Sequence, residues 1–243
     1  MLLVHMQHSF SAYTRVLKAV AFSVIAITLL SGCKARIGDR ISGVYALGRH
    51  PSEAKKNRLE ALLRDRDRDV RATAIVVMET IDKDRARRMA VTALQDPDGL
   101  VRASAVSLSG DDAETVRTLA GLAVSDPVWQ VRARALDATA SSEDPAVRES
   151  FARAISDPVR QVRRGALRAA IAHPGLIPAE LLADLVASDP DWENRVDAAR
   201  ALGVSKDPAA YVGLDAALKD PNEFVRATAA RERRTLEGTG VPR

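Results

Sequence analysis

One ten-residue pattern returns along this chain at an almost constant interval, and it limits the fold to a repeat architecture. The pattern is Asp-x-x-x-x-Val-Arg-x-x-Ala, and in every copy the aspartate lies six residues before the arginine. Successive arginines are 31, 30, 31, 32 and 31 residues apart. A fixed period of about 20–50 residues is typical of folds in which each unit buries its apolar face only against its neighbours.

Six copies carry the pattern, and a further arginine lies one period before the first of them. The repeated aspartates are Asp65, Asp96, Asp126, Asp157, Asp189 and Asp220. The repeated arginines are Arg40, Arg71, Arg102, Arg132, Arg163, Arg195 and Arg226. We interpret both sets as residues that build the repeat rather than as a functional site. Each carboxylate is expected to cap a helix, and each arginine to pair with a capping aspartate of its own or the neighbouring repeat.

Each period is expected to hold two helices joined by a short turn. Aspartate is a favoured N-cap and proline a favoured first helical residue, so Asp126-Pro127 predicts the start of one helix. Leu59 and Leu62 belong to the apolar stripe of another. Sustained alternation of period two is absent from the sequence, so we expect no sheet. The predicted fold class is all-α, an α-solenoid of about six and a half helix-turn-helix repeats of about 31 residues each.

The motif of Asp, turn, Val-Arg and Ala resembles the short HEAT-like repeats of the phycobilisome-lyase type. The resemblance covers residues 39–237 and implies a superhelix of helix pairs. Two positions depart from the pattern. Asn194 stands where the other copies have valine, and Arg66 stands where five copies have proline. The bilin-lyase relatives bind a tetrapyrrole and its acceptor protein, but nothing in this sequence marks a chromophore pocket.

The first 33 residues have the order of features found in an export signal. Arg15 and Lys18 precede twelve uncharged residues, 19–30, which are fewer than the roughly 20 needed to span a bilayer. The run ends in Leu-Ser-Gly-Cys, which resembles the lipobox of bacterial lipoprotein precursors. The resemblance implies cleavage between Gly32 and Cys33 and diacylation of the Cys33 thiol, with palmitate as one such chain. Two acyl chains anchor a protein stably, whereas one binds marginally. A secretory signal with an incidental cysteine, or an uncleaved anchor, is the alternative.

These features divide the precursor into four segments. They are a signal peptide at 1–32, a lipid-anchored linker at 33–38, the repeat solenoid at 39–237 and a flexible tail at 238–243. Removing the signal removes two cations and no acid, so the net charge falls from +4 to about +2 (4 − 2). That charge and an export signal oppose nucleic-acid binding. We expect a lipid-anchored location in the bacterial cell envelope. In a Gram-negative source, Lys34 after the cysteine favours the outer membrane facing the periplasm.

Catalytic chemistry finds little support in the sequence. A single cysteine excludes an internal disulfide and a cysteine-ligated zinc site. One HEAT-like family, the deoxyhypusine hydroxylases, binds two irons through His-Glu pairs, and this chain has no His-Glu dipeptide. His50 and His173 are about four repeats apart. Phosphate-binding glycine loops are also absent. We therefore expect no catalytic residue, no metal and no cofactor.

Residues that differ between repeats are the candidates for partner binding. Trp129 and Trp192 each follow their repeat aspartate by three residues, and Phe224 lies one position further along in its copy. A second set is a column of aligned cations on successive second helices: Arg168, Arg200 and Arg231. An acidic protein segment or an anionic lipid head group could contact that column.

The function predicted from these observations is a lipid-anchored envelope scaffold or adaptor that binds another protein through its solenoid surface. Two alternatives stay open. One is a lyase-like or other enzyme subunit built on the same repeats. The other is a structural envelope component without a dedicated ligand. An enzyme should show converging polar groups in a pocket, whereas a scaffold should show an extended surface.

Overall fold

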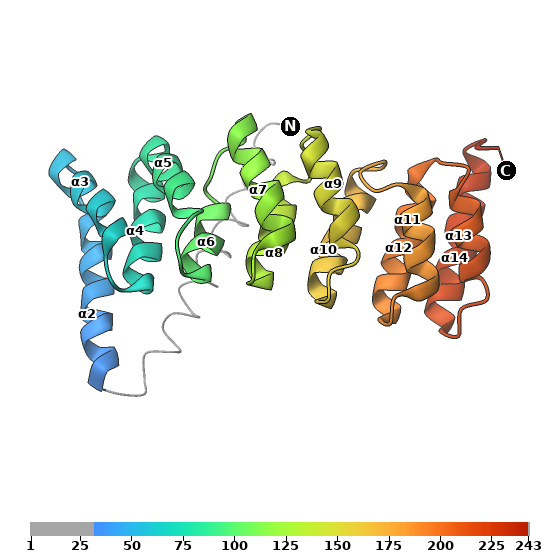
Figure 1. Ribbon diagram of the computed structural model, residues 1–243, viewed down its shortest axis with the longest axis horizontal. Coiled ribbons are helices and arrows are strands. Elements are labelled where there is room, and N and C mark those ends of the chain that lie inside the picture. The colour runs from blue at the N-terminus through green and yellow to red at the C-terminus, as the bar shows by residue number, and fades with distance from the viewer. Residues whose placement is uncertain (1–31, 243) are drawn as a thin grey trace, which may run out of the picture. The chain divides into compact units, whose positions relative to one another are not determined.

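The computed structural model describes residues 32–242, with side chains from residue 37 onward. That part of the chain holds thirteen α-helices and one 3₁₀ helix, and it contains no strand. The predicted all-α solenoid is therefore confirmed (Figure 1). The signal-peptide prediction falls on residues 1–31, which lie outside the described residues. The chain divides into two compact units, residues 1–81 and 82–243.

The first unit contains three α-helices and the 3₁₀ helix. They are α2 (Gly32–Leu47), α3 (Glu53–Ala61), η1 (Leu62–Arg64) and α4 (Arg68–Ile81). Helix α2 packs against α3 and α4 and buries Ile41 and Val44. The segment 33–38, which we expected to form a linker, lies inside α2. The helix extends to Gly32 although Gly38 lies in this segment, and no proline interrupts it.

The second unit contains ten helices in alternating first and second positions of the repeat. Their bounds are α5 (Lys83–Ala93), α6 (Gly99–Val106), α7 (Ala113–Ser125), α8 (Trp129–Thr139), α9 (Pro145–Ala154), α10 (Arg160–Ala172), α11 (Ala179–Ser188), α12 (Trp192–Ser205), α13 (Ala210–Ala217) and α14 (Glu223–Gly238). We call α2, α4 and the even-numbered members of this unit second helices, because they carry the repeated arginines. Each second helix of this unit contacts the next one, α6 to α8, then α10, α12 and α14.

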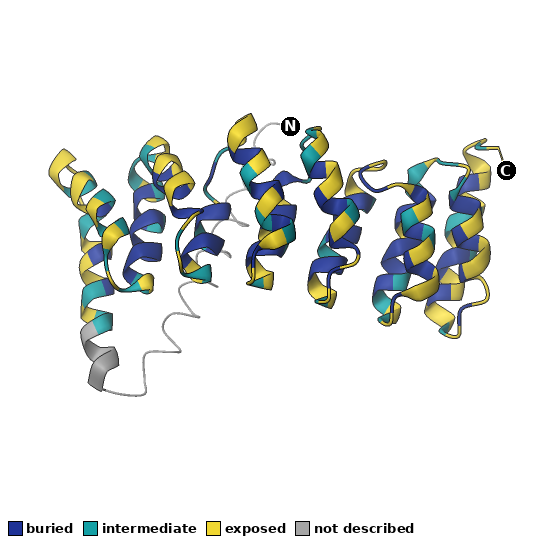
Figure 2. Cartoon of the chain, viewed as in Figure 1, coloured by how far each residue is buried: buried dark blue, intermediate teal, exposed yellow. Residues whose placement is uncertain are grey.

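The core of the second unit lies between its helices and consists of small and aliphatic side chains (Figure 2). Val131 and Leu136 on α8, and Val162 and Leu167 on α10, are completely buried. They recur at matching positions because the apolar stripe follows the helical period. Phe151 on α9 is the one fully buried phenylalanine among the described residues. Successive pairs therefore share one continuous packing layer within this unit.

The start of the second helices differs from our prediction. Helix α8 begins at Trp129 and has Val128 as its N-cap, whereas Asp126 is the residue that ends α7. The Asp126 carboxylate accepts the Val128 backbone N–H at 2.8 Å, which closes a local turn around Pro127. The prediction that Asp126-Pro127 starts the helix was wrong by two residues, because the carboxylate is used in that turn and by an arginine of the preceding repeat.

Four of the first helices have the side-chain caps that sequence rules anticipate, whereas α11 and α13 begin after Pro178 and Ala209 without one. Asp82, Asp112 and Asp144 accept backbone N–H groups at the starts of α5, α7 and α9, and Ser52 does so at α3. At the other end of the chain, α14 continues to Gly238, the first residue of the predicted tail. These caps satisfy N–H groups that a helix start leaves without partners.

Candidate partner-binding surface

The repeated arginines and aspartates form one regular series of contacts, which we call the Arg–Asp ladder. In five pairs, the arginine of one repeat reaches the aspartate that precedes the following second helix. The pairs are Arg40–Asp65 in the first unit and Arg102–Asp126, Arg132–Asp157, Arg163–Asp189 and Arg195–Asp220 in the second. The prediction left open whether the partner belongs to the same or the neighbouring repeat. The structure places the carboxylate partner in the neighbouring repeat.

Each ladder arginine of the second unit also binds backward to its own repeat. Arg132 donates from Nε and Nη2 to the two carboxylate oxygens of Asp157, at 2.6 and 2.9 Å, and from Nη1 to the Asp126 carbonyl at 2.7 Å. Both side chains of this pair are about nine-tenths buried. A two-pronged Arg–carboxylate contact is strong and strictly oriented. The ladder thus has a clear role in joining consecutive repeats.

The pKa values of the ladder carboxyls Asp65, Asp189 and Asp220 lie below their ordinary value. Burial by itself would raise each pKa, since it penalises the charged form. At Asp189 the hydrogen bonds from the Arg163 guanidinium and the Asp191 backbone N–H outweigh that effect and lower the pKa. The same kinds of contact lower the pKa of the other two. All three are therefore charged at neutral pH.

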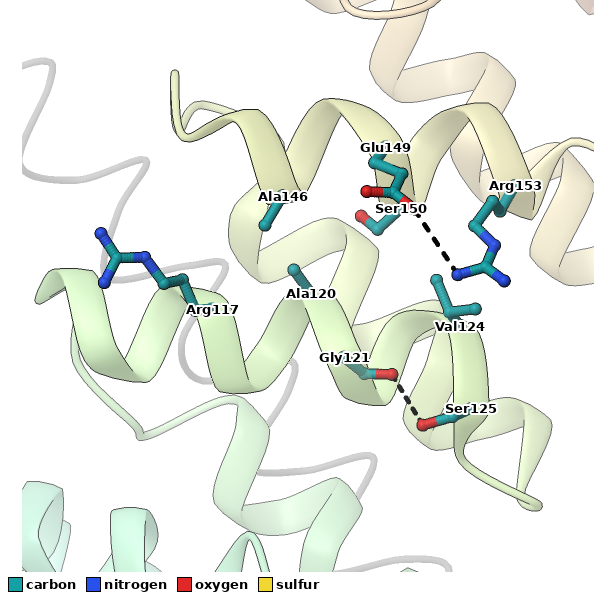
Figure 3. A pocket seen from close by; sticks show the side chains of 9 residues that line it. All are labelled: Arg117, Ala120, Gly121, Val124, Ser125, Ala146, Glu149, Ser150 and Arg153. Carbon is teal, nitrogen blue, oxygen red and sulfur yellow. Dashed lines mark hydrogen bonds and ion pairs between the residues drawn. The ribbon is translucent and has the colours of Figure 1, made fainter.

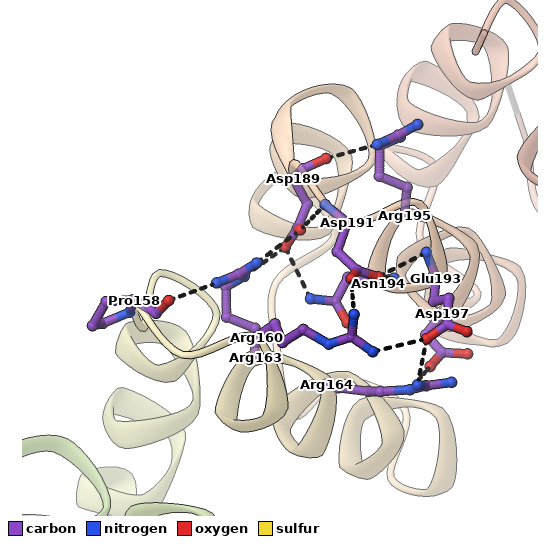
Figure 4. Close-up of polar contacts among 10 residues, drawn as sticks. All are labelled: Pro158, Arg160, Arg163, Arg164, Asp189, Asp191, Glu193, Asn194, Arg195 and Asp197. Atoms are coloured by element: carbon purple, nitrogen blue, oxygen red, sulfur yellow. Dashed lines mark hydrogen bonds and ion pairs between the residues drawn. The ribbon is translucent and has the colours of Figure 1, made fainter. Parts of the chain in front are cut away.

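Asn194, the departure from valine in the repeat pattern, has a structural explanation. Its side chain is buried, and its Nδ2 donates to Asp189 Oδ2 at 3.2 Å. The same carboxylate accepts from Arg163 Nε at 2.7 Å, so the asparagine adds a donor to an existing ladder pair (Figure 4). The substitution keeps a buried polar group satisfied, as burial requires.

The aromatic candidates lie where the second helices of the second unit begin. Trp129 is the first residue of α8, Trp192 the first of α12, and Phe224 the second of α14. Their exposed fractions are 36%, 41% and 58%. The rings of Trp192 and Phe224 stack with centroids 5.5 Å apart and planes inclined by 30°. We call these three side chains the aromatic edge.

A polar network beside the aromatic edge was not anticipated from the sequence. Arg160, the first residue of α10, binds Asp191 Oδ2 at 2.7 Å and Glu193 Oε2 at 3.3 Å (Figure 4). Arg164 binds the same Glu193 oxygen at 2.7 Å and Asp197 at 3.3 Å. Arg160 lies three residues after its repeat aspartate, at the register of the two tryptophans. Reading that column across all repeats would have revealed an aromatic–arginine–aromatic series.

The predicted column of cations, Arg168, Arg200 and Arg231, does lie on successive second helices. Two of its members have acidic partners on their own helices. Arg200 binds Asp197 at 3.1 Å, and Arg231 binds Glu232 at 2.6 Å. Arg168 makes no ion pair within the described part of the chain. The column is therefore mixed in charge, because Asp197 and Glu232 pair with two of its three arginines.

A shallow cavity of about 370 Å³ lies between α7 and α9 (Figure 3). Small residues such as Ala120 and Gly121 line it, with Arg117, Glu149 and Arg153 among its charged members. Its polar side chains bind one another or the local backbone. Arg153 lies 3.7 Å from Glu149, and the Ser125 hydroxyl donates to the Gly121 carbonyl. The cavity shows no group held ready for chemistry.

The described residues show neither a metal-binding cluster nor a membrane-spanning helix. Residues 32–242 contain no group of three or more metal-ligating side chains close enough to hold an ion. Within the same range, none of the helices is both long and apolar enough to cross a membrane. Cys33, the predicted lipidation site, lies in the first turn of α2, and its side chain is outside the described part.

Comparison with known proteins supports the repeat assignment. A sequence profile described as HEAT repeats matches residues 56–136. The Escherichia coli protein YibA is 22% identical, with 81% of this chain and 77% of that chain aligned at a TM-score of 0.54. An engineered protein is 20% identical over 76% of this chain and 97% of its own, also at 0.54. These identities establish similarity of fold.

Human deoxyhypusine hydroxylase in complex with glycerol also aligns, at 17% identity over 90% of this chain and 85% of that one. Its TM-score is 0.47, so it adds no functional argument. A comparison with curated proteins returned no match. Residues 56–136 thus match a HEAT-repeat profile, and the chain resembles other repeat proteins in structure.

Proposed function

We propose that this chain is a lipid-anchored scaffold of the bacterial cell envelope that binds another protein through the aromatic edge. The observation that carries the proposal is the exposure of Trp129, Trp192 and Phe224 within the first two residues of their second helices. Tryptophan is enriched in binding hot spots. When a partner covers exposed aromatic rings, their apolar surface is removed from water, which favours binding. The repeated polar residues, by contrast, satisfy one another inside the ladder.

The anchor in this proposal is Cys33, carried by the lipobox-like sequence that ends there. Helix α2 belongs to the second helices, since Arg40 contacts Asp65 as Arg102 contacts Asp126. A lipid on Cys33 would therefore attach directly to the first helix of the repeat array rather than to a long linker. We also assign the repeats to the phycobilisome-lyase type of HEAT-like repeat, on the Asp, Val-Arg and Ala motif.

The column of Arg168, Arg200 and Arg231 offers a weaker binding surface. Asp197 and Glu232 already neutralise two of its cations. An acidic partner would have to compete with those carboxylates, and exposed ion pairs are worth about 0–1 kcal/mol each. We therefore place the main contact on the aromatic edge and treat an acidic segment on this column as secondary.

Affinity purification of the full chain from detergent-solubilised membranes tests the proposal. The wild type is compared with a triple variant, Trp129→Ala, Trp192→Ala and Phe224→Ala. Tyr45→Ala is the matched control, because Tyr45 is an equally exposed aromatic on α2. We expect one protein to be retained by the wild type and by the control and lost from the triple variant. Retention by all three chains would refute the proposed surface. The absence of any retained protein would favour a structural component without a dedicated ligand.

A further inference from the structure

The part of the aromatic edge formed by Trp192 and Phe224 differs from the part formed by Trp129. Trp192 and Phe224 form a stacked pair across two adjacent helices, whereas Trp129 has no stacking partner among the described residues. Pairing fixes both rings before any ligand arrives, and such preorganisation lowers the entropy cost of binding. The outer surface of the pair stays accessible, with 41% of Trp192 and 58% of Phe224 exposed.

An acidic residue is adjacent in sequence to each ring of the pair. Glu193 follows Trp192, and Glu223 precedes Phe224, so each acid lies in the first turn of the same helix as its ring. Glu223 makes no hydrogen bond or ion pair with any described residue. No carboxylate adjoins Trp129, whose neighbours are Val128 and Gln130. The two tryptophans thus share a register and differ in their electrostatic surroundings.

The arginines at this end of the unit are already engaged. Arg160 binds Asp191 and Glu193, and Arg195 binds Asp220. Arg226 donates from Nη1 to the Asp220 carbonyl at 2.7 Å. The stacked rings are therefore open to solvent, and the first turn of α14, which carries Phe224, also carries Glu223 as an exposed carboxylate without an ion pair to any described residue. A cation over an aromatic face, close to a carboxylate, is attracted by both groups.

We propose that the Trp192–Phe224 pair, together with Glu223, binds a lysine- or arginine-bearing segment of the partner protein. The inference rests on the proposed function and adds the chemical class of the contact. The cationic side chain lies against the ring pair, and its charge is balanced by Glu223. An apolar stem of lysine or arginine covers ring surface that is now exposed. Charge complementarity favours this occupant over an acidic segment or an anionic membrane.

The two tryptophans are the only ones in the chain, which makes fluorescence a site-resolved probe. In the full chain in detergent, Trp129→Phe leaves Trp192 as the sole reporter, and Trp192→Phe leaves Trp129. The probes are two eight-residue peptides, one alternating glycine and arginine and the other alternating glycine and glutamate. We expect a saturable emission change with the arginine peptide in Trp129→Phe, and none in Trp192→Phe. The glutamate peptide should leave both unchanged.

Two substitutions in the Trp129→Phe background separate the components of the contact. Phe224→Leu keeps an apolar side chain but removes the ring, and we expect about threefold weaker binding. Glu223→Gln removes the charge at constant shape, and we expect about twofold weaker binding of the arginine peptide. Added salt should abolish this difference between the variant and its parent. Both residues are exposed, so an unchanged thermal midpoint confirms that each variant is folded.

Three results would overturn the inference. They are equal responses to both peptides, an undiminished response in the Phe224→Leu and Glu223→Gln variants, and a response to phosphatidylglycerol vesicles but not to the arginine peptide. None of them bears on retention of a partner by the full chain. Failure of this inference is therefore distinguishable from failure of the proposed function.

Discussion

Arg163 and Asp189 belong to consecutive repeats and are joined by two parallel hydrogen bonds, from Nε at 2.7 Å and from Nη2 at 3.0 Å. The third guanidinium nitrogen, Nη1, donates to the Asp157 carbonyl at 2.8 Å. One side chain thus ties its own turn to the next repeat. Because the pair is buried, each partner depends on the other to offset its desolvation. This relationship recurs through the second unit and governs its expected response to mutation and to pH.

Removing a ladder arginine should be strongly destabilising. Arg132→Ala leaves the Asp157 carboxylate buried without its guanidinium, and we expect a loss of about 3 kcal/mol in the free energy of unfolding. Urea unfolding monitored by circular dichroism measures the change. Arg153→Ala is the control, since the Arg153 side chain is 63% exposed and lies 3.7 Å from Glu149. We expect that control to stay within about 0.5 kcal/mol of the wild type. Equal losses in the two variants would contradict the assigned role of the ladder.

Stability should fall on acidification in a window set by the ladder carboxyls. Asp65, Asp189 and Asp220 have folded pKa values below the unfolded value of about 3.9. Their contribution is therefore complete above the unfolded pKa and is lost as pH falls through the folded pKa values. Thermal midpoints measured from pH 7 to pH 2 should be flat at first and then decline below about pH 4. Asp189→Asn should be less stable at pH 7 and decline less steeply. A profile that stays flat to pH 2 would rule out this linkage.

Two helical glycines should respond in opposite directions to alanine. A Cβ at Gly203 would lie 2.6 Å from the Glu232 Cβ, where α12 and α14 approach closely. We expect Gly203→Ala to cost about 1–3 kcal/mol. A Cβ at Gly165 on α10 would meet no atom within 4 Å, so Gly165→Ala should stabilise the protein by about 0.5–1 kcal/mol. Thermal midpoints of the two variants measure the contrast. A stabilising Gly203→Ala would show that the two helices do not pack this closely.

Lipidation can be tested directly on Cys33. Cells expressing the full chain are labelled with palmitate, and we expect incorporation in the wild type and none in Cys33→Ala. The variant should also be lost from the membrane fraction, because a chain without acyl groups has no stable membrane anchor. Lys34→Ala is the control and should be labelled like the wild type. Equal labelling of Cys33→Ala and the wild type would refute the anchor.

Much of the fold follows from the sequence because the repeat period is carried by many residues at once. The register of Asp126 and Arg132 alone fixes where one turn and one second helix fall. The predicted start of α8 was wrong by two residues because local rules treat Asp126 as a cap. Its carboxylate is instead used by Arg102, whose partner lies 24 residues away in sequence. A contact of that range leaves no local signal.

The candidate surface was only partly foreseen, for a related reason. The exposed positions of Trp192 and Phe224 follow from their register, but their stacking depends on the spacing between α12 and α14. The pairing of Arg160 with Glu193 likewise joins two helices, and it turns an apparently basic position into a neutral one. Neither contact can be read from the sequence, because each depends on how two helices pack against each other.

The Arg–Asp ladder has a direction, since in each of its five pairs the arginine reaches forward to an aspartate later in the chain. Cleavage of the chain just before Asp220 would leave Arg195 without its carboxylate partner. Cleavage just after Arg102 would leave Asp126 without its guanidinium partner. The cost of the unpaired charge differs between the two residues. A carboxylate can take up a proton and become neutral, while a guanidinium cannot lose one. Limited proteolysis in mild acid should thus erode this protein asymmetrically. Fragments that lose repeats from the amino-terminal side should persist longer than those that lose them from the carboxy-terminal side.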